Sequence, residues 1–448
     1  MHVSAAREEW ATSAGFVLAT IGSAVGIGNI WRFSYVAGEN GGGAFLIVYA
    51  LSVLLVGLPI VVGEMALGRR SRGDAVTAFS ITSPRSPWRF AGWIPVVGCT
   101  LILSFYAVVA GWALKYFIGA VTGTLWHTAE TGFGAYFRSF IASNGEPLSW
   151  QLAILGLTMF VVAGGVRAGI ETANRFLMPL LALCVIALAV YSATLPGAGA
   201  GWRFLLLPDW DAVFRGSVLV AAVGQAFFSI GVGMAVFITY ASYLGPTTRL
   251  PRSAAVIVAG DTFFAIVAGL AIFPAVFAFG MDPRAGPELA FITLPQIFLA
   301  MPGGKFVGAV FFGLLVAAAM TSMVSLLEVP VASLVHRTRL GRRRAVLAVG
   351  ATAFGLGIPS ALSFGLLSDI RFLDMGIFDL VDGLVSNYLL PLGGILVCAY
   401  AGWHLTGRDA RAAAGLDGTA MGTVWLWLLR VVAPATIVLV FLDVTGAF

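Results

Sequence analysis

Long uninterrupted apolar stretches are the feature that most constrains the fold of this chain. Several of them reach or exceed the roughly 20 residues that an α-helix needs to cross about 30 Å of hydrocarbon. Of the 448 residues, 59% are hydrophobic and only 10% are charged, whereas an ordinary soluble domain carries about 25% charged residues. We therefore expect a protein that has the lipid bilayer as its solvent.

The length of these stretches also selects the type of secondary structure. Lipid offers no hydrogen-bond partners, so spanning segments must be helices or strands of a closed barrel, and long apolar runs exclude the barrel. The first apolar stretch continues far past the length of a cleavable signal, so we expect it to be retained. The predicted fold is an all-α membrane protein, residues 1–448 forming a single transmembrane domain, with about eleven transmembrane helices near 12–37, 43–68, 90–122, 150–165, 173–195, 212–243, 253–280, 305–335, 345–366, 375–403 and 422–444.

Basic residues alternate with these helices and predict the orientation. They fall on one side of the predicted bundle, which the positive-inside rule assigns to the cytoplasm. With an odd helix count, a cytoplasmic N-terminus places the C-terminus outside an inner (plasma) membrane. The net charge of +5 is then a topology signal, and we expect no nucleic acid as a partner. The residues concerned are Arg7, Arg69, Arg70, Arg72, Arg85, Arg89, Arg167, Arg175, Arg249, Arg252, Arg337, Arg339, Arg342, Arg343, Arg344, Arg408 and Arg411.

Two of the predicted helices, the first and the sixth, contain glycine clusters at corresponding places. They begin successive groups of five helices, which suggests two repeats, near 12–195 and 212–403, followed by an extra helix near 422–444. An odd number of helices per repeat inverts the second repeat in the membrane. Paired glycine-interrupted helices are associated with midplane binding sites in secondary transporters, although glycine also serves close packing of membrane helices. The clusters are Gly22, Gly26 and Gly28, and Gly224, Gly231 and Gly233.

Polar side chains accompany both glycine clusters at membrane depth. Ser23 and Asn29 lie in the first, and Gln225 and Ser229 in the second. Unwound backbone is tolerated in the membrane only around a cavity or a ligand. Its carbonyls and an amide oxygen are hard neutral donors that suit sodium, whereas freed amides and a helix N-terminus suit a carboxylate.

Acids inside membrane helices are expensive, and each is a functional-site hypothesis by default. Asp261, in the seventh predicted helix, is the strongest candidate among them. The alternative is that it lies near the end of the helix and is solvated. For Glu64 and Glu328 we favour structural partnership with arginines. Thr321 and Ser322 on the eighth helix are further candidates, although such hydroxyls can bond to the carbonyl four residues back.

The chain resembles the neurotransmitter:sodium symporter family, in particular its bacterial transporters of hydrophobic amino acids. The resemblance extends over helices one to ten and rests on four segments, REEWATSAGFVLATIGSAVGIGNIWRF, ENGGGAF, AVGQAFFSIGVGMAVFITYASY and AAAMTSMVSLLEVPVAS. It implies transport rather than enzymatic catalysis. The implied fold has inverted five-helix repeats with broken helices one and six.

The resemblance also implies two sodium sites and a substrate pocket. The first sodium site would use Ala24, Asn29, Ser229 and Asp261, and the second Gly22, Val25, Ala318, Thr321 and Ser322. Tyr106 would hold the substrate carboxylate. The full set of substrate-binding residues would be Ser23, Ala24, Ile27, Gly28, Tyr106, Phe228, Ser229, Gly231, Met234, Ser322 and Leu326.

Gate and hinge residues follow from the same resemblance. Phe228 over Tyr106 would form the outer lid, and Arg32 with Asp382 an outer ion pair. The inner gate would use Arg7, Trp10 and Tyr243. The spacing of Gly169 and Pro179 matches one associated with unwinding of helix five.

Three positions depart from the family pattern. Many relatives carry a neutral amide where this chain has Asp261, and Ala265 stands where some supply a glutamate, so we expect no chloride requirement and leave proton counter-transport by Asp261 open. Gly231 and Met234 replace larger or polar residues, which predicts a pocket that takes aromatic amino acids. His336 stands where relatives place an acid to pair with Arg7, which weakens the inner-gate assignment.

Together these features predict a sodium-coupled symporter of hydrophobic L-amino acids that works by alternating access. A sensor that kept the site without transporting is an alternative, as is a channel, whereas the scattered histidines argue against a membrane enzyme. The sequence leaves open the preferred amino acid, the sodium stoichiometry, the inner-gate partner of Arg7 and the oligomeric state.

Overall fold

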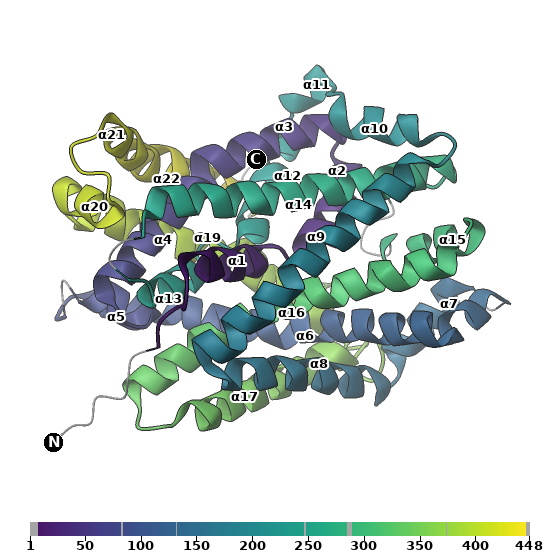
Figure 1. Ribbon diagram of the computed structural model, residues 1–448, viewed down its shortest axis with the longest axis horizontal. Helices are drawn as coiled ribbons and strands as arrows, with labels where there is room; N and C mark the ends of the chain where they lie inside the picture. The colour runs from purple at the N-terminus through teal and green to yellow at the C-terminus, as the bar shows by residue number, and fades with distance from the viewer. Residues whose placement is uncertain are drawn as a thin grey trace.

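The protein is a bundle of helices that run roughly along one long axis (Figure 1). The computed structural model describes residues 8–81, 84–130, 132–245, 248–284, 289–372 and 374–444. Within these ranges there are helices but no strand, apart from an isolated bridge between Phe372 and Met375. The predicted all-α class is confirmed.

Nine helices in the described ranges are long and apolar enough to cross a membrane, and ten if a bent first pair counts as one span. Length and composition therefore do not establish the predicted count of eleven, because the sixth predicted helix is divided into short pieces. The nine spans are Gly43–Ser71 (α3, Gly43–Ser52, to α4, Leu58–Ser71), Pro87–Thr122 (chiefly α6, Trp93–Thr122), Glu146–Ala163 (α8), Val166–Ala193 (chiefly α9, Thr172–Ala193), Leu250–Ala278 (α14), Gly304–Arg337 (α16), Arg342–Leu362 (α17), Ile377–His404 (α18, Ile377–Leu384, and α19, Leu390–Val397) and Ala420–Leu442 (α21, Ala420–Trp427, and α22, which ends at Val444).

The first helix is broken, as predicted, although the break is narrower than the glycine cluster. Helix α1 (Ser13–Ala24) ends before Val25, and the chain continues through a π-helical turn into α2 (Phe33–Glu39) with a bend of 52°. Gly22 lies inside α1 and does not interrupt it. Val25 and Gly26 are the non-helical residues.

The sixth helix is divided into α12 (Gly216–Ile230) and α13 (Val236–Ser242). Gly231 (φ +75°) caps α12 in the left-handed conformation and its N–H bonds to the Phe227 carbonyl, a common way for a helix to stop. Gly233 (φ +86°) follows in the same region, and so does Ala235 (φ +55°), where a non-glycine residue is strained. Gly224, predicted to interrupt the helix, lies within intact α12.

The sequence reading missed the short helices that connect the spans. Their apolar runs are below the length that a membrane crossing needs, so hydropathy gave no signal. Figure 1 shows α7, α10 and α15 towards one end of the bundle and α5 and α20 towards the other. The predicted start of helix six at 212 is also wrong, since α11 is a separate turn. The missed helices are α5 (Ala75–Ser80), α7 (Phe133–Ala142), α10 (Ala198–Leu206), α11 (Trp210–Val213), α15 (Thr293–Ala300) and α20 (Gly407–Ala414).

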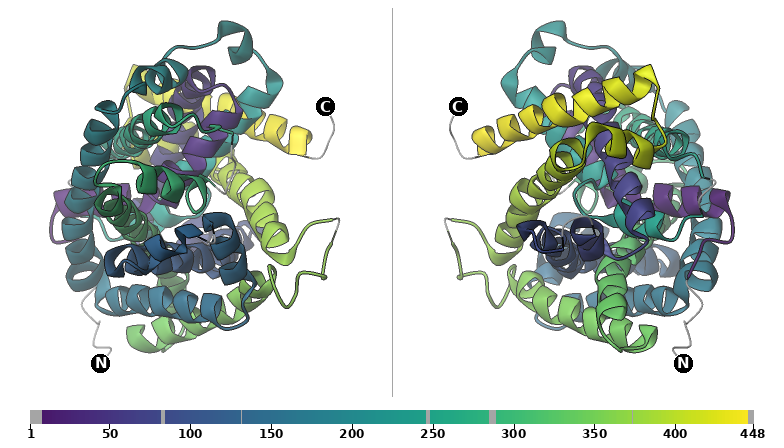
Figure 2. Two further views of the ribbon diagram at one scale, coloured as in Figure 1. Left: turned by 90° about the vertical axis from the view of Figure 1, so that its right-hand side faces the viewer. Right: turned by 90° about the vertical axis from the view of Figure 1, so that its left-hand side faces the viewer.

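Burial separates the central helices from those that face lipid. The most apolar windows of α6 and α16 are 78% buried inside the protein, compared with 33% for α8 and 28% for the helix that contains α9. The two central helices pack against one another, and both end views show other helices arranged around the middle of the bundle (Figure 2). The two breaks lie in contact with this centre, where lipid does not reach the unwound backbone.

Candidate functional site

Three of the four residues predicted for the first sodium site lie together at the breaks. The Asn29 amide nitrogen donates to Asp261 Oδ1 (2.7 Å) and to Ser229 Oγ (3.0 Å), and Ser229 Oγ donates to Asp261 Oδ2 (2.8 Å). Asn29 and Asp261 are fully buried. Ala24 lines the cavity beside this cluster. Tyr49 of α3, which the sequence reading missed, donates to Asp261 Oδ2 at 3.4 Å.

The second predicted sodium site is also largely brought together. Thr321 Oγ1 donates to the carbonyl oxygens of Val25 (3.3 Å) and Ala318 (2.9 Å). Ser322 Oγ donates to the carbonyl of Ser23 at 3.2 Å. Gly22 lies in α1, three residues before Val25, and an added Cβ would lie 2.1 Å from Asn174 Oδ1 of α9, so a role for its carbonyl in this site stays a prediction.

The chemistry of both clusters fits sodium. The converging groups are carboxylate, hydroxyl, amide and backbone carbonyl oxygens, which are the ligands that hard cations prefer. The first cluster carries a full negative charge at Asp261, whereas the second is neutral. A buried carboxylate is costly unless it is hydrogen-bonded or paired with a cation, so a monovalent cation suits this position.

Tyr106 lies at the unwound part of helix one, where it can meet a carboxylate. Its hydroxyl accepts a hydrogen bond from the Ile27 N–H (3.0 Å). Gly26 fits closely between two hydroxyls, because an added Cβ would lie 2.5 Å from Ser322 Oγ and 2.8 Å from Tyr106 Oη. The close approach explains why glycine stands here, with backbone and hydroxyl donors converging on one point.

A small cavity of about 40 Å³ adjoins both clusters. It is lined by ten of the eleven predicted substrate-binding residues, Ser23, Ala24, Gly28, Tyr106, Phe228, Ser229, Gly231, Met234, Ser322 and Leu326. The eleventh, Ile27, lines instead a second and larger cavity, on the other side of Phe228 and Tyr106. The reading missed Gly26, Ile102, Val236, Ser325 and Leu390, of which Ile102 and Ser325 lie one helical turn from the predicted residues Tyr106 and Ser322.

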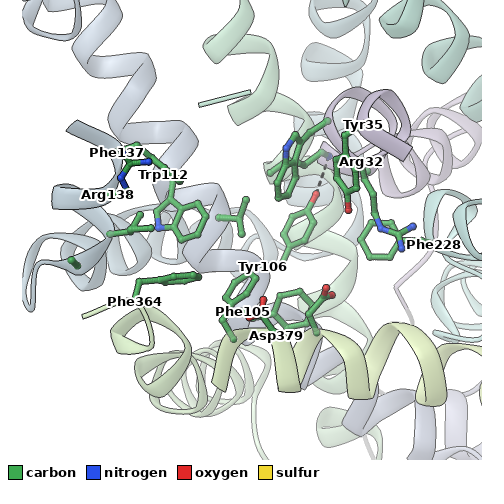
Figure 3. Close-up of a pocket in the computed structure, with 18 residues that line it drawn as sticks. Arg32, Tyr35, Phe105, Tyr106, Trp112, Phe137, Arg138, Phe228, Phe364 and Asp379 are labelled. Atoms are coloured by element: carbon green, nitrogen blue, oxygen red, sulfur yellow. Dashed lines mark hydrogen bonds between the residues drawn. The ribbon is translucent and has the colours of Figure 1, made fainter. Parts of the chain in front are cut away.

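A larger cavity of about 570 Å³ opens on the other side of Phe228 and Tyr106 (Figure 3). Arg32 Nη1 donates to Gln225 Oε1 (2.8 Å), and its guanidinium lies 4.5 Å from the centre of the Phe228 ring. Asp382 lines the same cavity but accepts from Ser386 Oγ. Arg32 and Asp382 thus line one cavity but bond to different partners, and the predicted ion pair between them is not formed in this conformation.

The opposite end of the site is closed by packed aromatic rings. Trp10 Nε1 donates to the Tyr240 carbonyl (2.8 Å), and the Trp10 ring meets Phe16, Tyr240 and Tyr243 edge to face. Trp10 and Tyr243, two of the three residues predicted for the inner gate, thus pack together, and their role as a gate stays a prediction. Arg7, the third predicted gate residue, lies outside the described residues.

A charged network that the sequence reading did not assemble lies beside these rings. Glu328 accepts from the Tyr243 hydroxyl (2.7 Å) and pairs with Arg342 (2.5 Å), which also pairs with Glu8 (3.1 Å). The structural role predicted for Glu328 is thus supported by its arginine partner. His336 lies 3.9 Å from Asp74 rather than near this network.

Glu64 differs from the prediction, because its partner is backbone. Its Oε1 accepts a hydrogen bond from the N–H of Gly233 (2.6 Å) in the unwound part of helix six, and within the described residues it forms no ion pair with an arginine. The Met234 carbonyl accepts from Cys99 Sγ (3.1 Å). These two side chains satisfy backbone groups that lipid could not.

The predicted hinge residues occupy a distorted helix. Gly169 lies in a π-helical segment, Val166–Glu171, and an added Cβ would lie 2.0 Å from the Val161 carbonyl oxygen. Pro179 lies inside α9. Glu171, which the sequence reading missed, accepts from the Ala11 N–H (2.7 Å) and from Thr12 Oγ1 (3.1 Å), so this segment is tied to the start of helix one.

Comparisons with known proteins agree with this geometry. The model of the sodium:neurotransmitter symporter family matches residues 7–135 and 135–445. An uncharacterized sodium-dependent transporter of Bacillus subtilis, YhdH, is 41% identical, with 98% of each chain covered. The sodium-dependent serotonin transporter of Drosophila melanogaster is 28% identical over 82% of this chain and 66% of its own.

A solved structure supports the same assignment. The crystal structure of MhsT in complex with L-phenylalanine has a TM-score of 0.92 and 48% sequence identity, and covers 98% of this chain and 100% of its own. The match confirms the fold, and the named relatives are sodium-dependent transporters rather than enzymes. The chain belongs to the sodium:neurotransmitter symporter family.

Proposed function

We propose that this protein couples sodium entry to the uptake of hydrophobic L-amino acids, aromatic ones included, by alternating access. The observation that carries the proposal is the convergence of Asn29, Ser229 and Asp261 beside a cavity lined by Tyr106 and Phe228. The phenylalanine complex of MhsT, at 48% identity, supports an amino acid of this class.

Two sodium ions would bind in the two oxygen clusters described above. In the first, Asp261 supplies the charge, and the substrate carboxylate at Tyr106 completes the ligand set. In the second, the hydroxyls of Thr321 and Ser322 and the carbonyls of Gly22, Val25 and Ala318 would be the ligands. Because the substrate is itself an ion ligand, neither binding step is complete without the other, and this linkage makes binding cooperative.

Chloride independence follows from the same residue. Asp261 carries the negative charge inside the cluster, and Ala265, one turn further along α14, is a buried small side chain. A fixed carboxylate needs no mobile anion to balance the sodium ion. Asp261 is also the group that would carry a proton outward on the return step if proton counter-transport occurs.

The conformation is consistent with alternating access. The 570 Å³ cavity reaches Tyr106 and Phe228 from one end, whereas Trp10, Tyr243 and the Glu328–Arg342 pair close the other. Closure of the outer end would bring Arg32 to Asp382, and unwinding near Gly169 would open the inner end. We assign the arginine-rich end and the N-terminus to the cytoplasm, and the C-terminus to the outside.

Binding of radiolabelled leucine and tryptophan to purified protein tests the proposal. We expect binding in sodium chloride and equally in sodium gluconate, and none in choline chloride. Binding in choline chloride would contradict sodium coupling, and a loss in gluconate would contradict chloride independence. Counterflow in liposomes separates a transporter from a sensor, because only a transporter accumulates label inside.

The Met234→Ala substitution should favour large substrates. The 40 Å³ cavity has room for only a few water molecules, so a bulky substrate side chain must displace Met234, whose flexible side chain can repack. We expect the affinity for tryptophan relative to leucine to rise by about tenfold, the scale of a small volume change in an apolar pocket. Competition binding measures this ratio.

Met159→Ala is the matched control, because Met159 packs against Gly350 on lipid-facing helices. An unchanged ratio of tryptophan to leucine affinity in Met234→Ala would show that Met234 does not limit the size of the bound side chain. Gly231 is a poorer probe, since its φ of +75° makes any side chain there strained.

A further inference from the structure

A second large cavity, of about 990 Å³, lies apart from the transport site. It is formed where α4, the beginning of α14 and the loop from α20 to α21 meet, towards the end of the bundle that carries α5 and α20 (Figure 1). The cavity is open rather than enclosed and belongs to neither ion cluster. Its lining divides into a basic part and an apolar part.

The basic part holds three arginines. Arg69 is fixed in place, because its guanidinium donates to the carbonyls of Thr248 (2.9 Å) and Ala413 (2.7 Å). Arg249 and Arg252 are exposed, and within the described ranges neither forms an ion pair. The described lining contains no acid, so the positive charge is uncompensated.

The apolar part continues from the arginines towards the middle of the membrane. Leu54, Leu58 and Val62 follow one another at intervals of four residues along the span Gly43–Ser71, and therefore form one row. Val424 and Leu428 face them from the last helix, where Trp425 is fixed by a hydrogen bond from its Nε1 to the Pro59 carbonyl (3.0 Å). Leu54 and Val424 are each more than half exposed.

We propose that this groove binds an anionic glycerophospholipid of the leaflet on the arginine-rich side. The phosphate would lie among the three arginines, and an acyl chain along the apolar row between the span Gly43–Ser71 and the last span, Ala420–Leu442. Basic pockets between membrane helices bind such headgroups, and a guanidinium pairs with phosphate through two parallel hydrogen bonds. A free anion would leave the apolar row without a partner.

The charge also argues against a second copy of the chain as the occupant. In a two-fold symmetric contact the same surface meets itself, which would bring Arg249 and Arg252 towards their own copies. Like charges at close range repel. A lipid supplies the opposite charge and the apolar chain in one molecule.

Native mass spectrometry of the detergent-solubilised full chain tests the proposal with dioleoyl phosphatidylglycerol and dioleoyl phosphatidylcholine. We expect the first retained lipid to be phosphatidylglycerol, with at least about tenfold preference. The double variant Arg249→Gln/Arg252→Gln should lose the preference. The double variant Arg343→Gln/Arg344→Gln, which removes two exposed arginines outside the groove, should keep it.

Loss of the preference in both double variants would overturn the proposal, since general surface charge would then explain it, and so would its retention in both. Ala255→Trp provides a variant that leaves the charges intact. Ala255 is exposed on the groove wall, and the indole would fill the space for the acyl chain, so binding should fall about tenfold. Displacement of the lipid by millimolar inorganic phosphate would indicate an anion site alone and would also overturn it.

Discussion

Asp261→Asn is expected to abolish sodium-dependent amino-acid binding. The asparagine has the same shape but no charge, so the sodium ion would lose its one anionic protein ligand in a fully buried cluster. An uncompensated buried charge costs several kcal/mol, which corresponds to a loss of about a hundredfold or more in affinity. Sodium titration of leucine binding measures the change.

The anion in the buffer extends this experiment. If Asp261→Asn binds leucine in sodium chloride but not in sodium gluconate, chloride replaces the missing negative charge. The Asp261 carboxylate would then contribute to binding through its charge. Cys184→Ala, on the half-buried face of α9, should bind like the wild type and serves as the control. Wild-type affinity of Asp261→Asn in gluconate would refute the first sodium site.

Arg342→Met is expected to destabilise the protein and to weaken closure of the inner end. It would leave Glu328 fully buried with only the Tyr243 hydroxyl as a partner, and would remove the ion pair of Glu8, which would keep its hydrogen bond from the Val166 N–H. Removing one partner of a buried ion pair costs about 3–5 kcal/mol. We expect a clear fall in the melting temperature, together with greater labelling of a cysteine placed at Ser325, behind the inner rings.

Two comparisons make this result specific. Arg175→Met breaks the pair with Glu171, but Arg175 is 61% exposed, and Glu171, although only 1% exposed, keeps its hydrogen bonds from Ala11 and Thr12, so the fall in melting temperature should be smaller. The double variant Glu328→Gln/Arg342→Met removes both charges and should recover part of the lost stability. A melting temperature for Arg342→Met equal to that of Arg175→Met would show that the pair does not hold the inner end.

The sequence predicted the fold well where one physical rule dominates. The lengths of the apolar stretches located most spanning helices to within a few residues, and the two glycine clusters located both helix breaks. It failed where helices are short, as for α7 and α15, because hydropathy has no length signal there. The division into two five-helix repeats stays a prediction.

The candidate site was predictable where polar residues stand out in an apolar helix. Asn29, Ser229 and Asp261 do so, and the structure brings them together. Tyr49 was missed because an aromatic residue in a membrane helix is unremarkable. Glu64 was assigned the wrong kind of partner, since a sequence does not show that the unwound N–H of Gly233 lies beside it.

The π-helical segment Val166–Glu171 places one extra residue between two contacts that hold the closed inner end. Glu8 accepts a hydrogen bond from the N–H of Val166 at the start of this segment, and Glu171 at its end accepts from Ala11 and Thr12. A π-turn contains one residue more than an α-turn, so deleting one residue there should leave α9 in its present helical phase, whereas a deletion within α9 would rotate everything beyond it by about 100°. The seal at this end therefore depends on the phase of α9 more than on the number of residues in the segment before it.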